Sequence, residues 1–471
     1  CNGLVNPDRG PHPAMAEVKY VHQNVGFDAI DAASGKFNIT NRFYFTNLKK
    51  YQIHYSVLAN GKTVKSGKVS LDIAPQASKE FTVPVNGLKA RPGTEYFVNF
   101  SVIAVEPEPL IPAGYEIAYD QFRLPVEAER NTYKANGPAL QTQTQGDELT
   151  VSSSKVNFVF NKKSGLVTSY KVDGTEYFKD GFGIQPNFWR APNDNDYGNG
   201  APKRLHVWKQ SSKDFHVTDT KVSTEDKAVL LQATYLLAAG NLYVVTYKIY
   251  PSGIVHVNAS DAARKAASKL EVPRIGVRFR LPAQMNNVQY FGRGPEENYI
   301  DRNHGTMVGI YQTTADKMYF NYVRPQENGH HTDTRWLNLS PDKGNGLVIV
   351  ADSLIGFNAL RNSVEVFDSE EALPHPYQWN NFSPEEAANH DEKAARNVLR
   401  RMHHVNDVTP RDFVEVCVDM KQQGVGGYDS WGARPEPFHQ IPANREYNWG
   451  FTLVPVRSGS QATEAAKYDY R

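Results

Sequence analysis

Cysteine is nearly absent from this chain of 471 residues, in which Cys1 and Cys417 are the only two. Two cysteines are too few for a disulfide framework, and their spacing matches no zinc finger. Cys417 lies in the apolar run from Phe413 to Val418, where a cysteine is typically a small buried hydrophobic residue. The sequence therefore excludes a disulfide-rich scaffold and a cysteine-based zinc site.

Excess charge and long hydrophobic runs are also missing. The formal net charge is +1 with no long run of one sign, which argues against nucleic acid as the main partner. No stretch of about 18 uninterrupted apolar residues occurs, so no membrane span is expected. Long amphipathic helical patterns are almost absent, whereas 25 tyrosines, 23 phenylalanines and short runs of Val and Thr favour strands. The sequence predicts an all-β protein, and its length suggests two or three domains.

Residues 14–125 contain short strands separated by turns. Asn60-Gly61 joins two of them and is a strong hairpin signal. In the last strand, the alternation from Tyr96 to Val102 suits a sheet with one buried face. We expect an immunoglobulin-like β-sandwich that acts as a spacer. The candidate strands are Val18–Val25, Lys36–Phe45, Gln52–Leu58, Thr63–Leu71, Lys79–Val85 and Glu95–Val105.

The rest of the chain divides by composition. Residues 1–13 are rich in Pro, Gly and Asn and are predicted to be a loop or tail, and residues 126–148 are polar and aperiodic, as a linker would be. Residues 149–457 contain many strands, which fits a large two-sheet sandwich. One helix is expected near Ser383, where a Ser-Pro-Glu-Glu sequence provides a cap and early acids. The polar tail 458–471 is predicted to be disordered.

The segment 188–200, FWRAPNDNDYGNG, is the most distinctive in the chain. Pro192 disfavours helix for the residue before it, and the Asn and Asp residues favour turns. We therefore expect a strand that ends in a polar loop. Two interpretations remain open: the Asn and Asp side chains close tight turns, or they bind a ligand beside Trp189 and Arg190.

Three further segments of the large domain mix Gly or Pro with acids and aromatics. They are 290–302 (YFGRGPEENYIDR), 322–333 (YVRPQENGHHTD) and 424–432 (GVGGYDSWG). One interpretation is that each is a structured turn with paired Arg and Glu. The other is that all four segments meet at one end of a sandwich and form a sugar site, in which aromatic rings stack on C–H faces and polar side chains bind hydroxyls.

RAPNDNDYG at 190–198 closely resembles a segment in the last domain of the long bacterial β-galactosidases of glycoside hydrolase family 2. The other three segments, the first domain and the termini resemble that family in the same order. The resemblance implies an immunoglobulin-like β-sandwich followed by a large galactose-mutarotase-like β-sandwich, or supersandwich. In the family, the 188–200 loop borders the sugar site and shifts when ligand binds.

Particular binding residues also follow from the resemblance. The Trp of the family's DSWG motif stacks on the sugar or aglycone, and Trp431 matches it here. Tyr428 stands where the family often has Asp, which leaves the outer part of the site in doubt. The resemblance thus implies substrate binding by Trp431, Asn195, Asp196 and Gly198.

In that family, both catalytic Glu residues and the magnesium ligands lie in an upstream (β/α)₈ barrel. No alternating βα pattern occurs in this chain, so we expect no catalytic residue here and no hydrolysis of lactose by this chain alone. Residues 1–13 resemble the end of the barrel, and Asn2 matches an Asn that helps to bind sodium. An Asn that satisfies turn backbone is an equal alternative.

The resemblance therefore implies a C-terminal portion of a β-galactosidase whose partners are the upstream barrel and a β-galactoside. No cofactor is expected in this portion, whereas the full-length enzyme would bind Mg and Na and form a homo-oligomer. A bacterial protein of the cytoplasm or periplasm is expected.

Two other functions remain as alternatives. One is a free-standing carbohydrate-binding module without a reaction. The other is an aldose epimerase-like enzyme, for which Glu297, Glu327, His330 and His331 are the available acids and bases. Adjacent histidines on a strand point to opposite faces, which disfavours a shared metal at His330 and His331.

Overall fold

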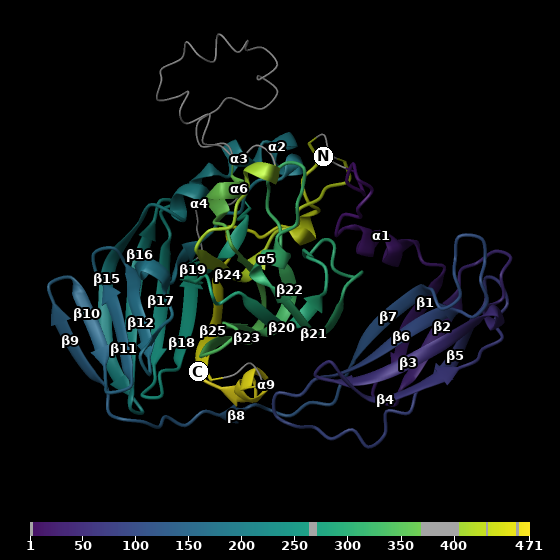
Figure 1. The fold of residues 1–471 in the computed structure, drawn as a ribbon, viewed down its shortest axis with the longest axis horizontal. Helices are drawn as coiled ribbons and strands as arrows, with labels where there is room; N and C mark the ends of the chain where they lie inside the picture. Colours follow the sequence, from purple (N-terminus) through teal and green to yellow (C-terminus); the bar gives the residue numbers. More distant parts are fainter. Residues whose placement is uncertain (1–2, 263–270, 369–404, 430–431, 458–460) are drawn as a thin grey trace, which may run out of the picture.

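The computed structural model describes residues 3–262, 271–368, 405–429, 432–457 and 461–471. Two β-sandwiches of unequal size lie side by side, joined by the β8 region and by direct contact (Figure 1). This arrangement confirms the predicted all-β fold with a small sandwich followed by a large one. The helix expected near Ser383 lies outside the described residues.

The small sandwich has seven strands in two antiparallel sheets. Its core is aromatic: the rings of Phe27 and Phe100 stack at 4.8 Å, and Phe37 meets Phe100 edge-on at 5.0 Å. Each of these rings lies on the buried face of its strand, because successive side chains of a strand point to opposite faces of the sheet. One sheet has the order β1 (Val25–Asp31), β2 (Lys36–Asn41), β5 (Ser78–Thr82), and the other β4 (Lys62–Val69), β3 (Tyr51–Ala59), β6 (Tyr96–Ala104), β7 (Glu116–Leu124).

The predicted strand Val18–Val25 is wrong, because residues Met15–His22 form helix α1 and the first strand begins at Val25. Strand propensity depends on packing against neighbours. Here the helix instead packs its side chains on β7, where Tyr20 lies 5.8 Å from the ring of Tyr119.

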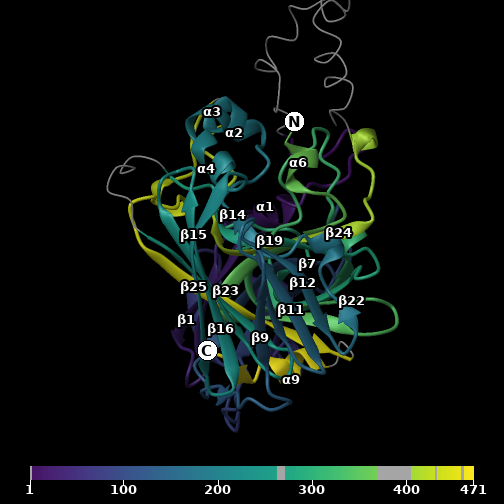
Figure 2. The ribbon, with the colours of Figure 1, turned by 90° about the vertical axis from the view of Figure 1, so that its left-hand side faces the viewer.

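The large sandwich is built on a twelve-stranded sheet that faces a five-stranded one, with one hydrophobic core between them. In Figure 2 the strands of both sheets run roughly vertically beneath the helices α2–α4. The five-stranded sheet has the order β13 (Thr175–Glu176), β12 (Leu166–Val172), β11 (Val156–Asn161), β10 (Glu148–Ser152), β9 (Gln141–Gln145).

The main path of the twelve-stranded sheet is β14 (Gln185–Asn187), β19 (Arg274–Pro282), β24 (Phe413–Gln422), β23 (Gly346–Leu360), β25 (Tyr447–Val456), β18 (Val255–Asp261), β17 (Leu242–Ile249), β16 (Ala228–Leu237), β15 (Phe215–Glu225). β20 (Asn287–Gly294) pairs with β21 (Met307–Thr314) and β22 (His331–Ser340), and β22 pairs with β23. The short helices are α2 (Asp194–Gly198), α3 (Ala201–Arg204), α4 (His206–Ser211), α5 (Ala315–Met318) and α6 (Val364–Phe367), with 3₁₀ turns at Leu48–Lys50, Lys179–Gly181, Val405–Asp407 and Pro437–His439.

The C-terminal tail is ordered, which corrects the predicted disorder of 458–471 for the residues that the structure describes. Helix α9 (Ala462–Ala465) precedes β26 (Tyr468–Asp469), which pairs in parallel with β8 (Asn131–Thr132). Tyr470 is only 4% exposed, and its carbonyl accepts a hydrogen bond of 2.7 Å from the hydroxyl of Tyr250. Aromatic packing against distant residues orders a segment whose own sequence is polar.

The predicted linker 126–148 is likewise partly built into the fold. Besides β8, it contains β9, which pairs with β10 although all five of its residues are exposed. The backbone ladder with β10 stabilises this strand without a buried face.

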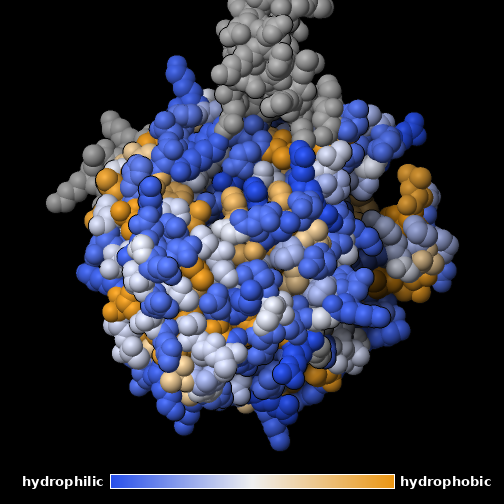
Figure 3. Space-filling model, turned by 60° about the vertical axis from the view of Figure 1, so that its left-hand side comes forward, coloured by the Kyte–Doolittle hydropathy of each residue, from blue (hydrophilic) through white to orange (hydrophobic). Residues whose placement is uncertain are grey.

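Figure 3 shows one face of the molecule, on which hydrophobic residues lie scattered among hydrophilic ones. Among the described residues, no helix combines the length and the apolar character that a membrane crossing needs.

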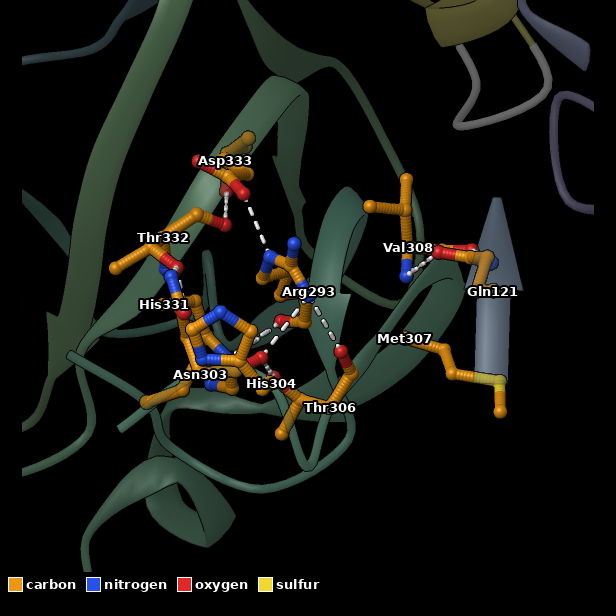
Figure 4. A network of polar contacts seen from close by, with 12 residues as sticks. Gln121, Arg293, Asn303, His304, Thr306, Met307, Val308, His331, Thr332 and Asp333 are labelled. Atoms are coloured by element: carbon orange, nitrogen blue, oxygen red, sulfur yellow. Dashed lines mark hydrogen bonds and ion pairs between the residues drawn. The ribbon is translucent and has the colours of Figure 1, made fainter. Parts of the chain in front are cut away.

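The two sandwiches contact each other along β7 and β21. The side-chain amide of Gln121 pairs with the backbone of Val308: Nε2 donates to the carbonyl at 2.9 Å, and the Val308 N–H donates to Oε1 at 2.8 Å (Figure 4). Nearby, the hydroxyl of Tyr119 donates to the carbonyl of Gly305 at 2.8 Å. A Cβ at Gly305 would lie 2.4 Å from the backbone of Ala16, so glycine is required for this close approach.

Arg293 holds the loop on the large-domain side of this contact. Its guanidinium donates to the carbonyls of Asn303 at 2.9 Å and Thr306 at 2.8 Å, and its Nε lies 2.6 Å from the carboxylate of Asp333 (Figure 4). One side chain thus fixes the loop that meets the small domain.

Gln121→Leu should weaken the junction. Leucine keeps the volume but leaves the N–H and C=O of Val308 without partners, which costs about 1–3 kcal/mol. Urea unfolding monitored by fluorescence measures the loss. Gln143→Leu, at an exposed position of β9, is the matched control, and equal losses in both variants would contradict this account of the junction.

Candidate functional site

Four segments that are far apart in the sequence line one cavity of about 290 Å³ at the end of the large sandwich. Helices α2 and α3 and the N-terminal segment lie at this same end in both ribbon views (Figures 1 and 2). All four of the segments singled out in the sequence contribute to it. The lining residues are His12, Ala14, Asn193, Asn195, Tyr299, Asp301, Arg302, Tyr322, Gln326, Glu327, Val425 and Gly426.

The first segment is anchored by an ion pair in the interior. Arg190 is 2% exposed, and its Nε and Nη2 lie 3.2 and 2.8 Å from the two carboxylate oxygens of Asp196. The remaining guanidinium donors reach the carbonyls of Gln423 at 2.7 Å and Gly424 at 3.0 Å. Arg190 therefore ties the first segment to the fourth.

A polar loop was predicted after the strand in 188–200, but residues Asp194–Gly198 form helix α2. This helix begins with a capping box at Asn193. The side chain of Asn193 accepts from the N–H of Asp196 at 2.8 Å, and the carboxylate of Asp196 accepts from the N–H of Asn193 at 3.2 Å. This reciprocal arrangement satisfies donors that a helix start leaves unpaired. Asp196 thus positions the segment, and its predicted contact with sugar stays a prediction.

Asn195 and Gly198 occupy the other two predicted positions of this segment. The amide nitrogen of Asn195 donates to the carbonyl of Val425 at 3.2 Å, and its Oδ1 is buried without a partner among the described residues. Gly198 is exposed, and its carbonyl lies 3.5 Å from the place that a Cβ on Gly432 would take. The first and fourth segments therefore meet here too. Trp431 and Asn2 lie outside the described residues.

Asp301 lies in the predicted segment 290–302 and lines the cavity, although it is not among the predicted binding residues. Its Oδ2 accepts from the N–H of Gly426 at 2.7 Å, while its buried Oδ1 has no partner in the described part of the chain. Tyr299 is 1% exposed, and its hydroxyl is likewise buried and unpartnered within the described residues. The only signal for Asp301 in the sequence is that an acid stands directly before Arg302 in YIDR.

Within the described residues, three oxygens around the cavity have no hydrogen-bond partner: Asn195 Oδ1, Asp301 Oδ1 and the Tyr299 hydroxyl. Buried polar atoms are nearly always paired in folded proteins, so a ligand or water is expected to meet them. Two of the three can only accept hydrogen bonds. They therefore suit a ligand rich in hydroxyl donors.

Glu297 has its carboxylate occupied. Its Oε1 accepts from the hydroxyl of Tyr322 at 2.5 Å and from Arg302 at 2.6 Å, and its Oε2 accepts from the N–H of Gly329 at 2.5 Å. These contacts connect the second and third segments. Glu297 is accordingly a positioning residue for Arg302 and Tyr322, both of which line the cavity.

Glu327 lies in the wall of the cavity and is paired with a buried arginine. Burial raises the pKa of Glu327, and the positive charge of Arg274, whose Nη2 lies 3.1 Å from Oε1, opposes the rise. Arg274 also lies 3.2 Å from Asp419, whose pKa burial raises to about 7. The three groups link the cavity to strands β19 and β24.

His330 and His331 are both fully buried. Burial lowers the pKa of His330 well below its ordinary value, and its ring stacks on Tyr299 at 5.3 Å. Burial lowers the pKa of His331 to about 4, and its Nδ1 lies 3.1 Å from the carbonyl of Arg293. Both histidines are therefore neutral at pH 7 and belong to the packing around the cavity.

The chain is similar in sequence to known β-galactosidases. The family of the β-galactosidase small chain matches residues 152–453, and the family of β-galactosidase domain 4 matches residues 37–125. The chain is 34% identical to a β-galactosidase of Priestia megaterium, and 27% identical to those of Streptococcus thermophilus and Vibrio cholerae. These matches cover 97%, 97% and 98% of this chain but only 41%, 40% and 41% of the relatives.

The chain thus spans about two fifths of the length of these curated relatives. Among solved structures, a putative aldose 1-epimerase from Escherichia coli K12 is similar over 68% of this chain and 99% of its own, with 9% identity and a TM-score of 0.33. A galactose 1-epimerase from Lactobacillus acidophilus is similar over 69% and 99%, with 8% identity and a TM-score of 0.34. Both TM-scores are low, so the architecture rests on the strand pairing described above.

Asp196→Asn should destabilise the protein strongly. The substitution keeps the shape but leaves the guanidinium of Arg190 buried without its counter-charge, which typically costs about 3–5 kcal/mol. Chemical unfolding measures the loss, with Asp147→Asn at an exposed turn as the control. A loss no larger than that of the control would contradict the anchoring role of this pair.

Stability should also fall as the pH drops from 6.5 to 4 because of His331. The unfolded chain binds a proton near pH 6.5, whereas the folded chain binds it only near pH 4. The shift corresponds to a loss on the order of 3 kcal/mol across that window. His331→Phe, which retains a ring beside Phe357, should flatten the pH dependence of the unfolding free energy, and an unchanged pH dependence would contradict this account.

Proposed function

Because this chain belongs to the β-galactosidase family, we propose that it is the non-catalytic part of an enzyme that hydrolyses terminal β-D-galactose from β-galactosides such as lactose. In this proposal, the chain contributes a carbohydrate-binding wall and the 188–200 segment to the active site of the complete protein. The catalytic carboxylates come from a (β/α)₈ domain upstream of this chain.

One observation carries the proposal: where four polar segments meet, the cavity presents buried oxygens that have no hydrogen-bond partner among the described residues. A galactose hydroxyl can donate a hydrogen bond to Asp301 Oδ1 or to Asn195 Oδ1. We expect Trp431, which precedes Gly432 beside Gly198, to stack on the sugar or the aglycone. An aromatic ring would contact the apolar C–H groups of the sugar, and the acceptors would bind its hydroxyl groups.

The described carboxylates of the cavity support a role in binding. A retaining glycosidase needs a nucleophile and an acid/base about 5 Å apart. Glu327 is paired with Arg274, and Asp301 accepts from the backbone of Gly426. Glu297, behind the cavity wall, has both oxygens engaged. We therefore propose that these residues orient the sugar and exclude water, which lowers the barrier by positioning alone.

We expect magnesium and sodium to serve the complete enzyme, chiefly through ligands outside this chain. Asn2 is the residue here that would contribute to the sodium site, with its side-chain oxygen as a hard ligand. Oxygen ligands are appropriate to such cations. We expect the complete enzyme to be a bacterial homo-oligomer.

The test is hydrolysis of o-nitrophenyl β-galactoside by this chain, by the separately produced upstream part, and by the mixture. The mixture should be active and each part silent. Asp301→Asn should raise the KM of the mixture about tenfold, because an acceptor that faces the cavity becomes a donor or is lost. Asp147→Asn serves as the control. Turnover by this chain alone would contradict the proposal.

A carbohydrate-binding module without a reaction remains the second candidate, since the same cavity oxygens, which lack a partner in the described part of the chain, favour it. Weak galactoside binding by the isolated chain, lost in Trp431→Ala, together with an inactive mixture, would favour that candidate. Mutarotation of galactose by the isolated chain would instead favour an aldose epimerase-like enzyme.

A further inference from the structure

A second and larger cleft, of about 470 Å³, lies where the small sandwich meets the large one. It shares no lining residue with the candidate site. Its walls come from the β3–β4 hairpin, from the irregular segment before β6, and from one residue each of β21 and α9. The lining residues are Ala59, Asn60, Lys62, Val64, Lys65, Gly87, Leu88, Lys89, Arg91, Thr94, Tyr96, Ile310 and Thr463.

Four cations line this cleft: Lys62, Lys65, Lys89 and Arg91. No carboxylate lines it among the described residues, and none of the four forms an ion pair within the described part of the chain. The ammonium of Lys65 donates to the backbone carbonyls of Pro84 and Asn86, so Lys62, Lys89 and Arg91 are the cations that can meet a ligand directly. The whole chain has a formal net charge of only +1. The four positive charges are therefore a local accumulation, and a cleft concentrates their field.

The nearest acid of this segment is already neutralised. The carboxylate of Glu95 lies 2.5 and 3.2 Å from the guanidinium of Arg335 and 3.0 Å from that of Arg123. Glu95 thus belongs to the contact between the sandwiches, and its charge does not balance the cleft.

The walls of the cleft are held in place. Asn60 donates to the carbonyl of Gly93 at 2.8 Å and accepts from the N–H of Glu95 at 2.8 Å. Gly61, with φ of +74°, lies against β21, where a Cβ would come 2.7 Å from the nitrogen of Ile310. The hairpin and the 87–96 segment therefore form a defined cleft, whose lining also includes the apolar side chains of Val64, Leu88, Tyr96 and Ile310.

Protection of an edge strand explains only part of this charge. β4 is the terminal strand of its sheet, and lysines on such a strand prevent edge-to-edge association. That role accounts for Lys62 and Lys65. It does not account for Lys89 and Arg91, which lie on a segment outside the strands and line the same cleft.

We propose that this cleft binds a small anion with two or more negative charges, carried by phosphate or carboxylate groups. Lys62, Lys89 and Arg91 bind the charged groups, and the apolar lining residues contact the rest of the ligand. A volume of this size is typical of small-molecule sites. The site is independent of the β-galactosidase proposal, since it uses none of the residues of the first cavity.

Isothermal titration of the full chain with pyrophosphate and, separately, with citrate tests the proposal at low salt and at about 0.15 M salt. The double variant Lys89→Gln/Arg91→Gln should weaken binding about tenfold or more, because two direct charge-assisted contacts are lost. The control Lys49→Gln/Lys68→Gln removes the same charge at exposed positions outside the cleft and should leave the affinity within about twofold.

Binding of pyrophosphate alone would identify phosphate as the preferred group, binding of citrate alone would identify carboxylate, and binding of both would indicate recognition of charge number. Each of these outcomes, with the loss confined to the cleft variant, supports the site. Absence of saturable binding for both anions, or equal losses in the cleft and control variants, would overturn it. All four substituted residues are exposed, so circular dichroism should give the same unfolding curve for both variants.

Discussion

The buried ion pair between Arg190 and Asp196 is the constraint on which the candidate site depends. A guanidinium that is 2% exposed requires its charge and all its donors to be satisfied, and here the donors reach one carboxylate and two backbone carbonyls. Those carbonyls belong to Gln423 and Gly424, at the end of β24. Because Arg190 fixes them, Asn193 and Asn195 can both donate to the carbonyl of Val425 one residue further on.

A second buried arginine ties this site to the sheet beneath it. Arg274, on β19, is fully buried and contacts Asp419 on β24 and Glu327 in the cavity wall. Two acids share one guanidinium, and burial raises the pKa of both. Such a network destabilises the protein strongly if one member is removed, yet its main effect is to specify one arrangement of the surrounding loops. The cavity is thereby built on rigid strands.

The junction of the two sandwiches lies between the candidate cavity and the basic cleft and contributes to both. On one side, α1 and Tyr119 approach the loop around Gly305, and the preceding segment contributes His12 to the cavity, where its ring meets Tyr322 edge-on at 5.4 Å. On the other side, the β3–β4 hairpin meets β21 and forms the basic cleft. The small sandwich supplies most of the residues that line that cleft.

The sequence by itself determined the all-β class and the two-sandwich organisation, because alternation of apolar residues depends only on neighbours along a strand. It also identified the four segments, since Gly, Pro, acids and aromatics occur together there. The sequence could not show that the carboxylate of Asp196 pairs with Arg190. Nor could it show that one carboxylate oxygen of Asp301 faces the cavity. It also missed the helix at Met15–His22 and the pairing of Tyr468 with Asn131. The tertiary structure decided these points, because the partner of Arg190 at Gln423 lies 233 residues further along the chain and local pattern carries no information about such contacts.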